Sequence, residues 1–143
     1  MASARSHVAL LTTPPEIFQS RLGPYPMNTE TRLIDVTALE AALQAFADER
    51  DWNQFHSPKN LAMALTGEVG ELVEIFQWLT EEQSRQVADD PQTARAVRDE
   101  LADVILYLIR LCSVLNVDLN EAVVHKIQTN TVKYPAGDST PHR

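Results

Sequence analysis

Two acidic pairs, each with a spacing of three residues, lie inside apolar segments: Glu68 with Glu71, and Glu100 with Asp103. On a helix this spacing puts both carboxylates of a pair on one face, about one turn apart. The flanking positions are apolar, and no obvious lysine or arginine partner stands beside the acids. At ~5 Å and an effective dielectric of about 20, each pair repels by roughly 3 kcal/mol. If the two pairs face one another, they require a counter-charge, and a divalent metal ion is the simplest one.

The ligand types favour Mg²⁺, because hard cations prefer carboxylate oxygens and Mg²⁺ leaves positions open for phosphate oxygens. A di-iron bundle would need Glu-x-x-His pairs, but the third residue after Glu68 and after Glu100 is acidic. An EF-hand is excluded because these acids lie on helices and not in a glycine-centred loop. Glu74 lies more than half a turn from the face of Glu68 and is an additional candidate ligand. The alternative is that all these acids simply face solvent.

Four aromatic residues lie close in sequence to the acidic pairs or in the connector before them: Trp52, Phe55, Trp78 and Tyr107. Such side chains usually pack in a core, but a planar base can also stack on them. His56 and His125 are more typical of surface or hydrogen-bonding positions than of metal ligands. The aromatic residues therefore allow a nucleobase site without establishing one.

A group of polar residues follows near the end of the chain. Lys126, Asn130 and Lys133 recur at i, i+4 and i+7 and share a helix face, with Tyr134 next to the last of them. They could bind phosphates, or they could form a solvated face with favourable charge near a helix C-terminus. Spacing alone does not decide between these two interpretations.

Composition limits the class of protein. The chain has 143 residues, 44% hydrophobic, and a net charge of −8, which argues against a nucleic-acid partner. Cys112 is the only cysteine, so no intrachain disulfide can form. No segment reaches the ~18 apolar residues of a membrane span, so we expect no membrane association and a cytoplasmic location.

Hydrophobic periodicity predicts an all-α protein with four main helices, over about 37–50, 58–79, 91–115 and 119–134. Ser57–Pro58 and Asp90–Pro91 are typical helix starts, and Thr37 with Glu40 and Asp118 with Glu121 resemble capping boxes. The acidic segment 80–90 is a loop or a short exposed helix. Leu39, Leu43, Phe46 and Ala47 should form the buried stripe of the first helix. Apolar residues cover much of the circumference of the longest helices, which predicts a homo-oligomer.

Prolines and glycine before residue 35 predict an irregular N-terminal arm over 1–34, followed by one domain over 35–135 and a flexible tail over 136–143. Gly67 and Gly70 flank Glu68 without forming a phosphate-binding motif. We expect them to permit close contact between helices.

Taken together, the segments RDWNQFHSPKNLAMALTGEVGELVEIFQW, DELADVILYLIRL and VDLNEAVVHKIQTNTVKYP resemble the MazG-like all-α nucleoside triphosphate pyrophosphatases. The likeness covers well over half of the chain and is greatest to the dCTP pyrophosphatase branch. It implies a four-helix-bundle-like fold, a homodimer or homotetramer, and active sites that use residues of more than one subunit.

The resemblance also implies roles for single residues. The Mg²⁺ ligands and catalytic acids would be Glu68, Glu71, Glu100 and Asp103. Trp52, Trp78 and Tyr107 would form the base pocket. The residues approaching the nucleotide would be Lys126, Asn130, Lys133 and Tyr134.

Two positions depart from family patterns. Many members have a doubled glutamate where this chain has Gly67 and Glu68, although the dCTP branch shares the glycine. That branch can also carry a histidine in the first helix, where this chain has Leu43. If that histidine contacts the base, its replacement by Leu43 affects the preference for cytosine.

The function expected from the resemblance is Mg²⁺-dependent hydrolysis of a (deoxy)nucleoside triphosphate, dCTP or a modified dCTP first, to monophosphate and pyrophosphate. A metal-activated water would attack, and Glu71 or Glu74 would accept its proton. One alternative is a related helical enzyme for dUTP or phosphoribosyl-ATP. The other is a non-catalytic helical module that mediates protein contacts.

Overall fold

The computed structural model describes residues 33–135 and residue 137, and every regular element in that part of the chain is helical. The helices are α1 (Thr37–Glu49), α2 (Pro58–Phe76), α3 (Glu81–Arg85), α4 (Pro91–Leu115) and α5 (Leu119–Lys133), with a short 3₁₀ turn, η2 (Asn53–Phe55). The all-α prediction is therefore confirmed for the described residues. Nearly all of the predicted arm and tail lies outside them.

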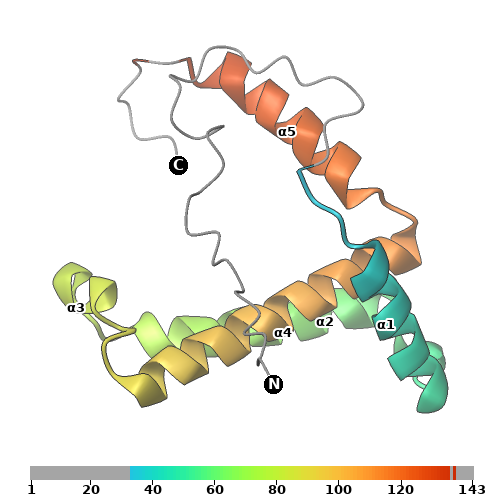
Figure 1. Ribbon diagram of the computed structural model, residues 1–143, viewed down its shortest axis with the longest axis horizontal. Coiled ribbons are helices and arrows are strands. Elements are labelled where there is room, and N and C mark those ends of the chain that lie inside the picture. The colour runs from blue at the N-terminus through green and yellow to red at the C-terminus, as the bar shows by residue number, and fades with distance from the viewer. Residues whose placement is uncertain (1–32, 136, 138–143) are drawn as a thin grey trace, which may run out of the picture.

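Helices α2 and α4 form the main packed pair, and α1 packs on α4 (Figure 1). The 25 residues of α4 rise about 37 Å, so this helix runs back along the whole of α2. Leu61 of α2 and Ile109 of α4 are almost fully buried, each 2% exposed. The two long helices thus provide the rigid surface on which the acidic pairs stand.

Most helix starts follow the predicted capping chemistry. The side chains of Ser57, Asp90 and Asp118 each accept a hydrogen bond from the backbone N–H three residues later, at 3.2, 3.0 and 2.9 Å. At the end of α4, Asn116 adopts a left-handed conformation with φ 53°, and the next N–H donates to the carbonyl of Cys112. A left-handed residue there closes the helix, as the predicted break required.

The predicted capping box at Thr37 and Glu40 is wrong. The N-cap of α1 is Val36, and the backbone N–H and hydroxyl of Thr37 both donate to the Asp35 carboxylate, at 3.1 and 2.8 Å. Because Asp35 takes the hydroxyl, Thr37 enters the helix as its first residue instead of capping it.

Two further details of the helix prediction are wrong. Helix α2 ends at Phe76 and not near Leu79, since the chain turns at Gln77 and Trp78. In the predicted stripe of α1 only Ala47 is fully buried, whereas Phe46 is 47% exposed and faces an aromatic neighbour instead of the core.

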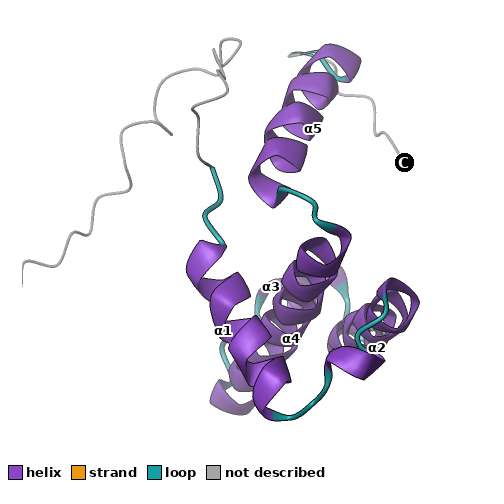
Figure 2. Ribbon diagram, turned by 90° about the vertical axis from the view of Figure 1, so that its right-hand side faces the viewer, coloured by secondary structure: helices purple, strands orange, loops and turns teal. Residues whose placement is uncertain are grey.

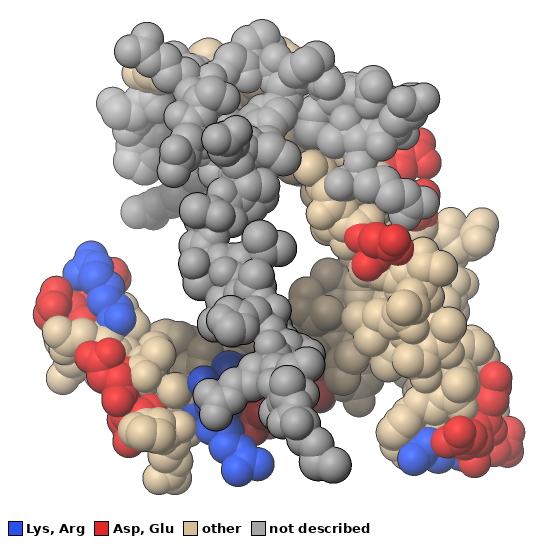
Figure 3. Space-filling view, in the orientation of Figure 1, with Lys and Arg blue, Asp and Glu red and all other residues tan. Residues whose placement is uncertain are grey.

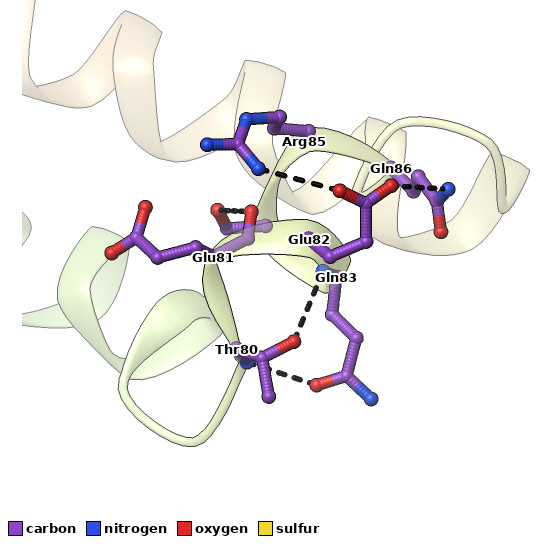
Figure 4. A network of polar contacts seen from close by, with 7 residues as sticks. Thr80, Glu81, Glu82, Gln83, Arg85 and Gln86 are labelled. Carbon is purple, nitrogen blue, oxygen red and sulfur yellow. Dashed lines mark hydrogen bonds and ion pairs between the residues drawn. The ribbon is translucent and has the colours of Figure 1, made fainter.

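The acidic segment between α2 and α4 contains the short helix α3. Thr80 and Gln83 cap its start reciprocally, Gln83 N–H to the Thr80 hydroxyl and Thr80 N–H to the Gln83 side chain (Figure 4). Arg85 lies 3.3 Å from Glu82 on the surface of this helix. Charged side chains accordingly gather over α3 and over the end of α1, while the corner between α1 and α4 is mainly uncharged (Figure 3).

Helix α5 extends away from the other helices in both views (Figures 1 and 2), and its contacts with them are sparse. Its start is held by the side chain of Asn120, which accepts hydrogen bonds from the backbone N–H groups of Leu33 and Ile34 at 2.8 and 3.1 Å. Within one chain the helices therefore do not close a four-helix bundle. None of the described helices is both long and apolar enough to cross a membrane.

Candidate metal and nucleotide site

Three of the four predicted acids converge between α2 and α4. Glu68, Glu71 and Glu100 each offer a carboxylate oxygen, and these three oxygens all lie within 4.8 Å of one another. Glu68 lies two turns beyond the buried Leu61 on α2, so it shares the face that packs on α4. The hydrophobic packing of the two helices thus brings the carboxylates together.

The cluster raises the pKa of two of its members. Burial raises the pKa of Glu68 above its ordinary value, and the neighbouring negative charges raise it further. The pKa of Glu100 is also raised, by desolvation first and then by the charges of Glu71 and Asp103. Both pKa shifts come from burial first and from neighbouring negative charge second. None of the ion pairs among the described residues involves these acids.

The residues fit a hard divalent cation. The donors are all carboxylate oxygens, and Oε2 of Glu100 is buried without a hydrogen-bond partner in the described structure. A buried oxygen left unpaired is costly, and a cation would satisfy it. Asp103 acts electrostatically on both Glu68 and Glu100 but does not belong to the group of three mutually close oxygens.

Three predicted side chains of α4 and the buried Arg110 lie along one stripe. Glu100, Asp103, Tyr107 and Arg110 recur at i, i+3, i+7 and i+10, which keeps them within one face of the helix. Arg110 follows Asp103 by about 10 Å along the axis at 1.5 Å per residue. The stripe thus leads from the acidic cluster to a second group of side chains around Arg110.

Trp52 belongs to that second group. The preceding Asp51 has a positive φ of 54°, and this turn brings the Trp52 N–H to the carbonyl of Ala47 at 2.9 Å. The indole is 44% exposed and packs edge to face against Phe46, at 5.7 Å between ring centroids, and against His56, at 6.3 Å. It is a partly accessible aromatic face held from two sides.

The other two predicted aromatic residues do not join Trp52. Trp78 follows the end of α2 and is 86% exposed, and Tyr107 lies half-buried on α4. Among the described residues, neither makes a ring contact with Trp52.

The structure also leaves the polar residues of the last helix apart from the acids. Lys126, Asn130 and Lys133 lie on α5 and Tyr134 caps it, and α5 extends away from α2 and α4 (Figure 2). Lys133 lies over the ring of Tyr134, 5.0 Å from its centroid. A single chain therefore does not bring these residues to the carboxylates.

The sequence analysis missed Arg110 and treated His56 as a surface or hydrogen-bonding residue. Arg110 is 6% exposed and donates hydrogen bonds to Gln44, Asn53 and His56 at 2.6, 2.7 and 3.0 Å. An available signal was the position of Arg110 inside an apolar helix, on the same stripe as Glu100 and Asp103.

Comparison with known proteins finds relatives of similar sequence. The chain is 45% identical over 113 residues to dCTP pyrophosphatase 1 of Bos taurus and 44% identical over 114 residues to that of Homo sapiens. These matches cover 79% and 80% of this chain but 65% of each relative, so the chain spans about two thirds of their length.

A solved structure is also similar. The crystal structure of a pyrophosphatase from Archaeoglobus fulgidus matches with a TM-score of 0.66 and 37% identity, over 76% of this chain and 99% of that one. The model of the MazG-like family matches residues 64–141, which include all four acids and the polar residues of α5. The chain belongs to the MazG-like family.

Proposed function

We propose that this protein is a nucleoside triphosphate pyrophosphohydrolase that cleaves the bond between the α and β phosphates, with dCTP or a modified dCTP as substrate. The observation that carries the proposal is the convergence of three carboxylate oxygens within 4.8 Å between α2 and α4. The names of the relatives, dCTP pyrophosphatase and pyrophosphatase, support both the reaction and the base.

Glu68, Glu71 and Glu100 would hold Mg²⁺, with Asp103 as a neighbouring fourth acid. Bound Mg²⁺ would neutralise charge on the triphosphate and lower the pKa of a coordinated water. The carboxylates would hold the cation on the surface formed by the two long helices. No serine or cysteine nucleophile is required.

The reaction adds one water across one bond. The water oxygen bonds to the α phosphorus, the bond from that phosphorus to the bridging oxygen breaks, and pyrophosphate leaves with the electron pair. Glu74 is the better candidate than Glu71 to accept the proton from the water. Glu74 lies near enough to act on the pKa of Glu100, yet it stays outside the group of three oxygens that would be committed to the cation.

Trp52 would supply the stacking face for the base, since its ring is partly exposed and held by two neighbouring rings. Trp78 and Tyr107 do not contact the Trp52 ring within one chain, so their part in the base pocket would depend on a second copy of the chain. The position corresponding to the branch's histidine is Leu43, so base selection would rest on other groups in this chain.

The phosphate-binding role proposed for α5 requires a second copy of the chain. Lys126, Asn130, Lys133 and Tyr134 do not reach the acids of their own chain, whereas a partner's α5 could lie over them. We therefore propose a homodimer or a homotetramer in which each site is completed across subunits.

The test is a panel of nucleoside triphosphates with Mg²⁺ and purified protein, with pyrophosphate and orthophosphate resolved. We expect pyrophosphate and dCMP from dCTP, a loss of turnover of about a hundredfold or more in Glu71→Gln, and no change in Glu81→Gln on α3. Mg²⁺ should raise the melting temperature of the parent protein and not that of Glu71→Gln.

Other outcomes assign other functions. Faster hydrolysis of dUTP or of phosphoribosyl-ATP would replace the proposed substrate. Orthophosphate and dCDP as products would contradict the bond proposed. A melting temperature unaffected by Mg²⁺, together with a silent Glu71→Gln, would favour a non-catalytic helical module.

A further inference from the structure

Arg110 is a buried cation that pairs directly with no acid among residues 33–135. Its three hydrogen bonds, at 2.6 to 3.0 Å, go to the neutral acceptors Gln44 on α1, Asn53 in η2 and His56 in the following connector. A guanidinium buried against neutral acceptors stabilises the folded state less than a well-packed hydrophobic side chain of similar size. The role of Arg110 is to position other segments, because its rigid fork of donors fixes α1, η2 and the following connector relative to α4.

Asp48 orients the two amide partners of Arg110. One carboxylate oxygen of Asp48 accepts from Gln44 Nε2 at 2.7 Å and from Asn53 Nδ2 at 2.6 Å. With both amide nitrogens taken by Asp48, both amide oxygens face the guanidinium. The result is an ion pair bridged by two amides, which fixes the direction of the Arg110 fork.

The third donor of that fork sets the state of His56. Arg110 Nε donates to Nδ1 of His56, so Nδ1 carries no proton and the neutral ring has its proton on Nε2. Burial and the charge of Arg110 also lower the pKa of His56. The imidazole is thereby fixed in one tautomer and one orientation.

His56 in turn contacts Trp52. The two rings meet edge to face, with 6.3 Å between centroids and an angle of 70°. Phe46 also contacts the indole edge to face, with 5.7 Å between ring centroids and an angle of 73° between the ring planes. Phe46 is part of α1, but His56 lies in a connector, where the hydrogen bond from Arg110 holds its ring.

We propose that Arg110 is a positioning residue of the nucleobase subsite: it fixes His56 and, through His56, holds Trp52 in the orientation that stacks a base. This inference rests on the proposed function for the role of Trp52. The nucleobase subsite would then be held in place from α4, the helix that also carries Glu100 and Asp103. Base pocket and acidic cluster would then share one rigid frame.

The test compares Arg110→Met, which removes the donors, with Arg110→Lys, which keeps the charge but not the fork. Arg95→Met on the same helix is the control, because Arg95 is exposed and, in the described part of the chain, its ion pair is with Asp99 at 3.5 Å. In both Arg110 variants we expect KM for dCTP to rise roughly tenfold with kcat within about twofold, since one stacking contact is weakened. The control should change neither.

A second readout does not depend on turnover. In the nucleotide-free protein, ¹⁵N NMR should show the Nε2–H tautomer of His56, and Arg110→Met should convert it to a tautomer mixture and shift the indole resonance of Trp52. dCMP without metal should shift that indole resonance at lower concentration in the parent protein than in the variant. Arg95→Met should match the parent in each measurement.

The outcomes separate the two proposals. Unchanged His56 and Trp52 resonances in both Arg110 variants would overturn the positioning role, as would a fall in kcat at constant KM. If the parent protein hydrolyses no nucleotide, the proposed function fails, and the resonances of the nucleotide-free protein still decide whether Arg110 holds Trp52.

Discussion

His56 illustrates how one neighbour sets the protonation of a side chain. Its Nδ1 accepts from Arg110, and burial and the adjacent positive charge lower its pKa from the ordinary value of 6.5. The unfolded chain has neither effect. Folding therefore changes the affinity of this ring for a proton, and stability must depend on pH through it.

The sign follows from the direction of the shift. Between the lowered pKa and about 6.5, the unfolded chain binds a proton that the folded chain does not, so stability falls as the pH drops through this window. We expect His56→Gln to show a smaller fall in melting temperature from pH 6.5 to pH 5, because glutamine does not titrate but can still accept from Arg110. Melting curves across this range check the prediction.

The control for that measurement is His125→Gln on the exposed surface of α5. It should follow the parent curve. Parallel curves for His56→Gln and the parent would show that His56 does not contribute to the acid sensitivity.

At the scale of residues, spacing predicted the acids but could not predict Arg110. Glu68 and Glu71 lie within one turn of one helix, so their common face is local information. The partners of Arg110 lie 54 to 66 positions away in sequence, and only the packing of α1 on α4 brings them together. Interactions that depend on tertiary packing are not encoded in local periodicity.

At the scale of elements, the helix starts were predictable because their chemistry is also local. Ser57, Asp90 and Asp118 each cap a backbone N–H three residues away. The end of α2 was harder, since no glycine or proline marks the turn after Phe76. The prediction of a cap at Thr37 was wrong for another reason, because the Asp35 carboxylate two residues earlier accepts the Thr37 hydroxyl.

The N-cap of α4 contributes measurably to the stability of the protein. Asp90 accepts from both the N–H and the hydroxyl of Thr93, at 3.0 and 2.9 Å. We expect Asp90→Ala to destabilise the protein by about 1 kcal/mol, since one helix donor loses its partner. Urea denaturation gives the free energy of unfolding that checks this value.

The neighbouring Asp89 provides the matched control, because its exposed carboxylate caps no helix. Asp89→Ala removes the same charge and should stay within about 0.5 kcal/mol of the parent. Equal losses in both variants would mean that general charge, not capping, stabilises α4.

At the scale of the molecule, the described helices carry much exposed apolar surface. Met63 and Val73 on α2 are 65% and 54% exposed, and Val132 on α5 is 83% exposed. The expectation that Gly67 and Gly70 permit close helix contact is not met within one chain, since a side chain added at either would meet nothing within 4 Å. Such surface is expected of a chain that pairs with another copy.

Pairing across subunits can be tested by mixing two inactive variants. Glu71→Gln lacks an acid and Lys133→Ala lacks a cation of α5, so each should be inactive or nearly so alone. If α5 of one copy serves the acids of another, random dimers formed after joint refolding should recover about a quarter of parental activity. Steady-state pyrophosphate release measures the recovery.

The alternative gives a different result. If each chain completes its own site, every site in the mixture still carries one defect, and activity stays at the level of the separate variants. Size-exclusion chromatography with light scattering, on the same samples, verifies that the variants still associate.

The separation of α5 from the acids has a consequence for how the enzyme would behave in a cell. In a lone chain the carboxylates of α2 and α4 and the lysines of α5 would stay apart, and under the proposed assembly hydrolysis would begin only when two chains associate. Turnover per chain would then increase with protein concentration until all chains are associated. At low concentration little nucleotide would be hydrolysed, and at high concentration much more.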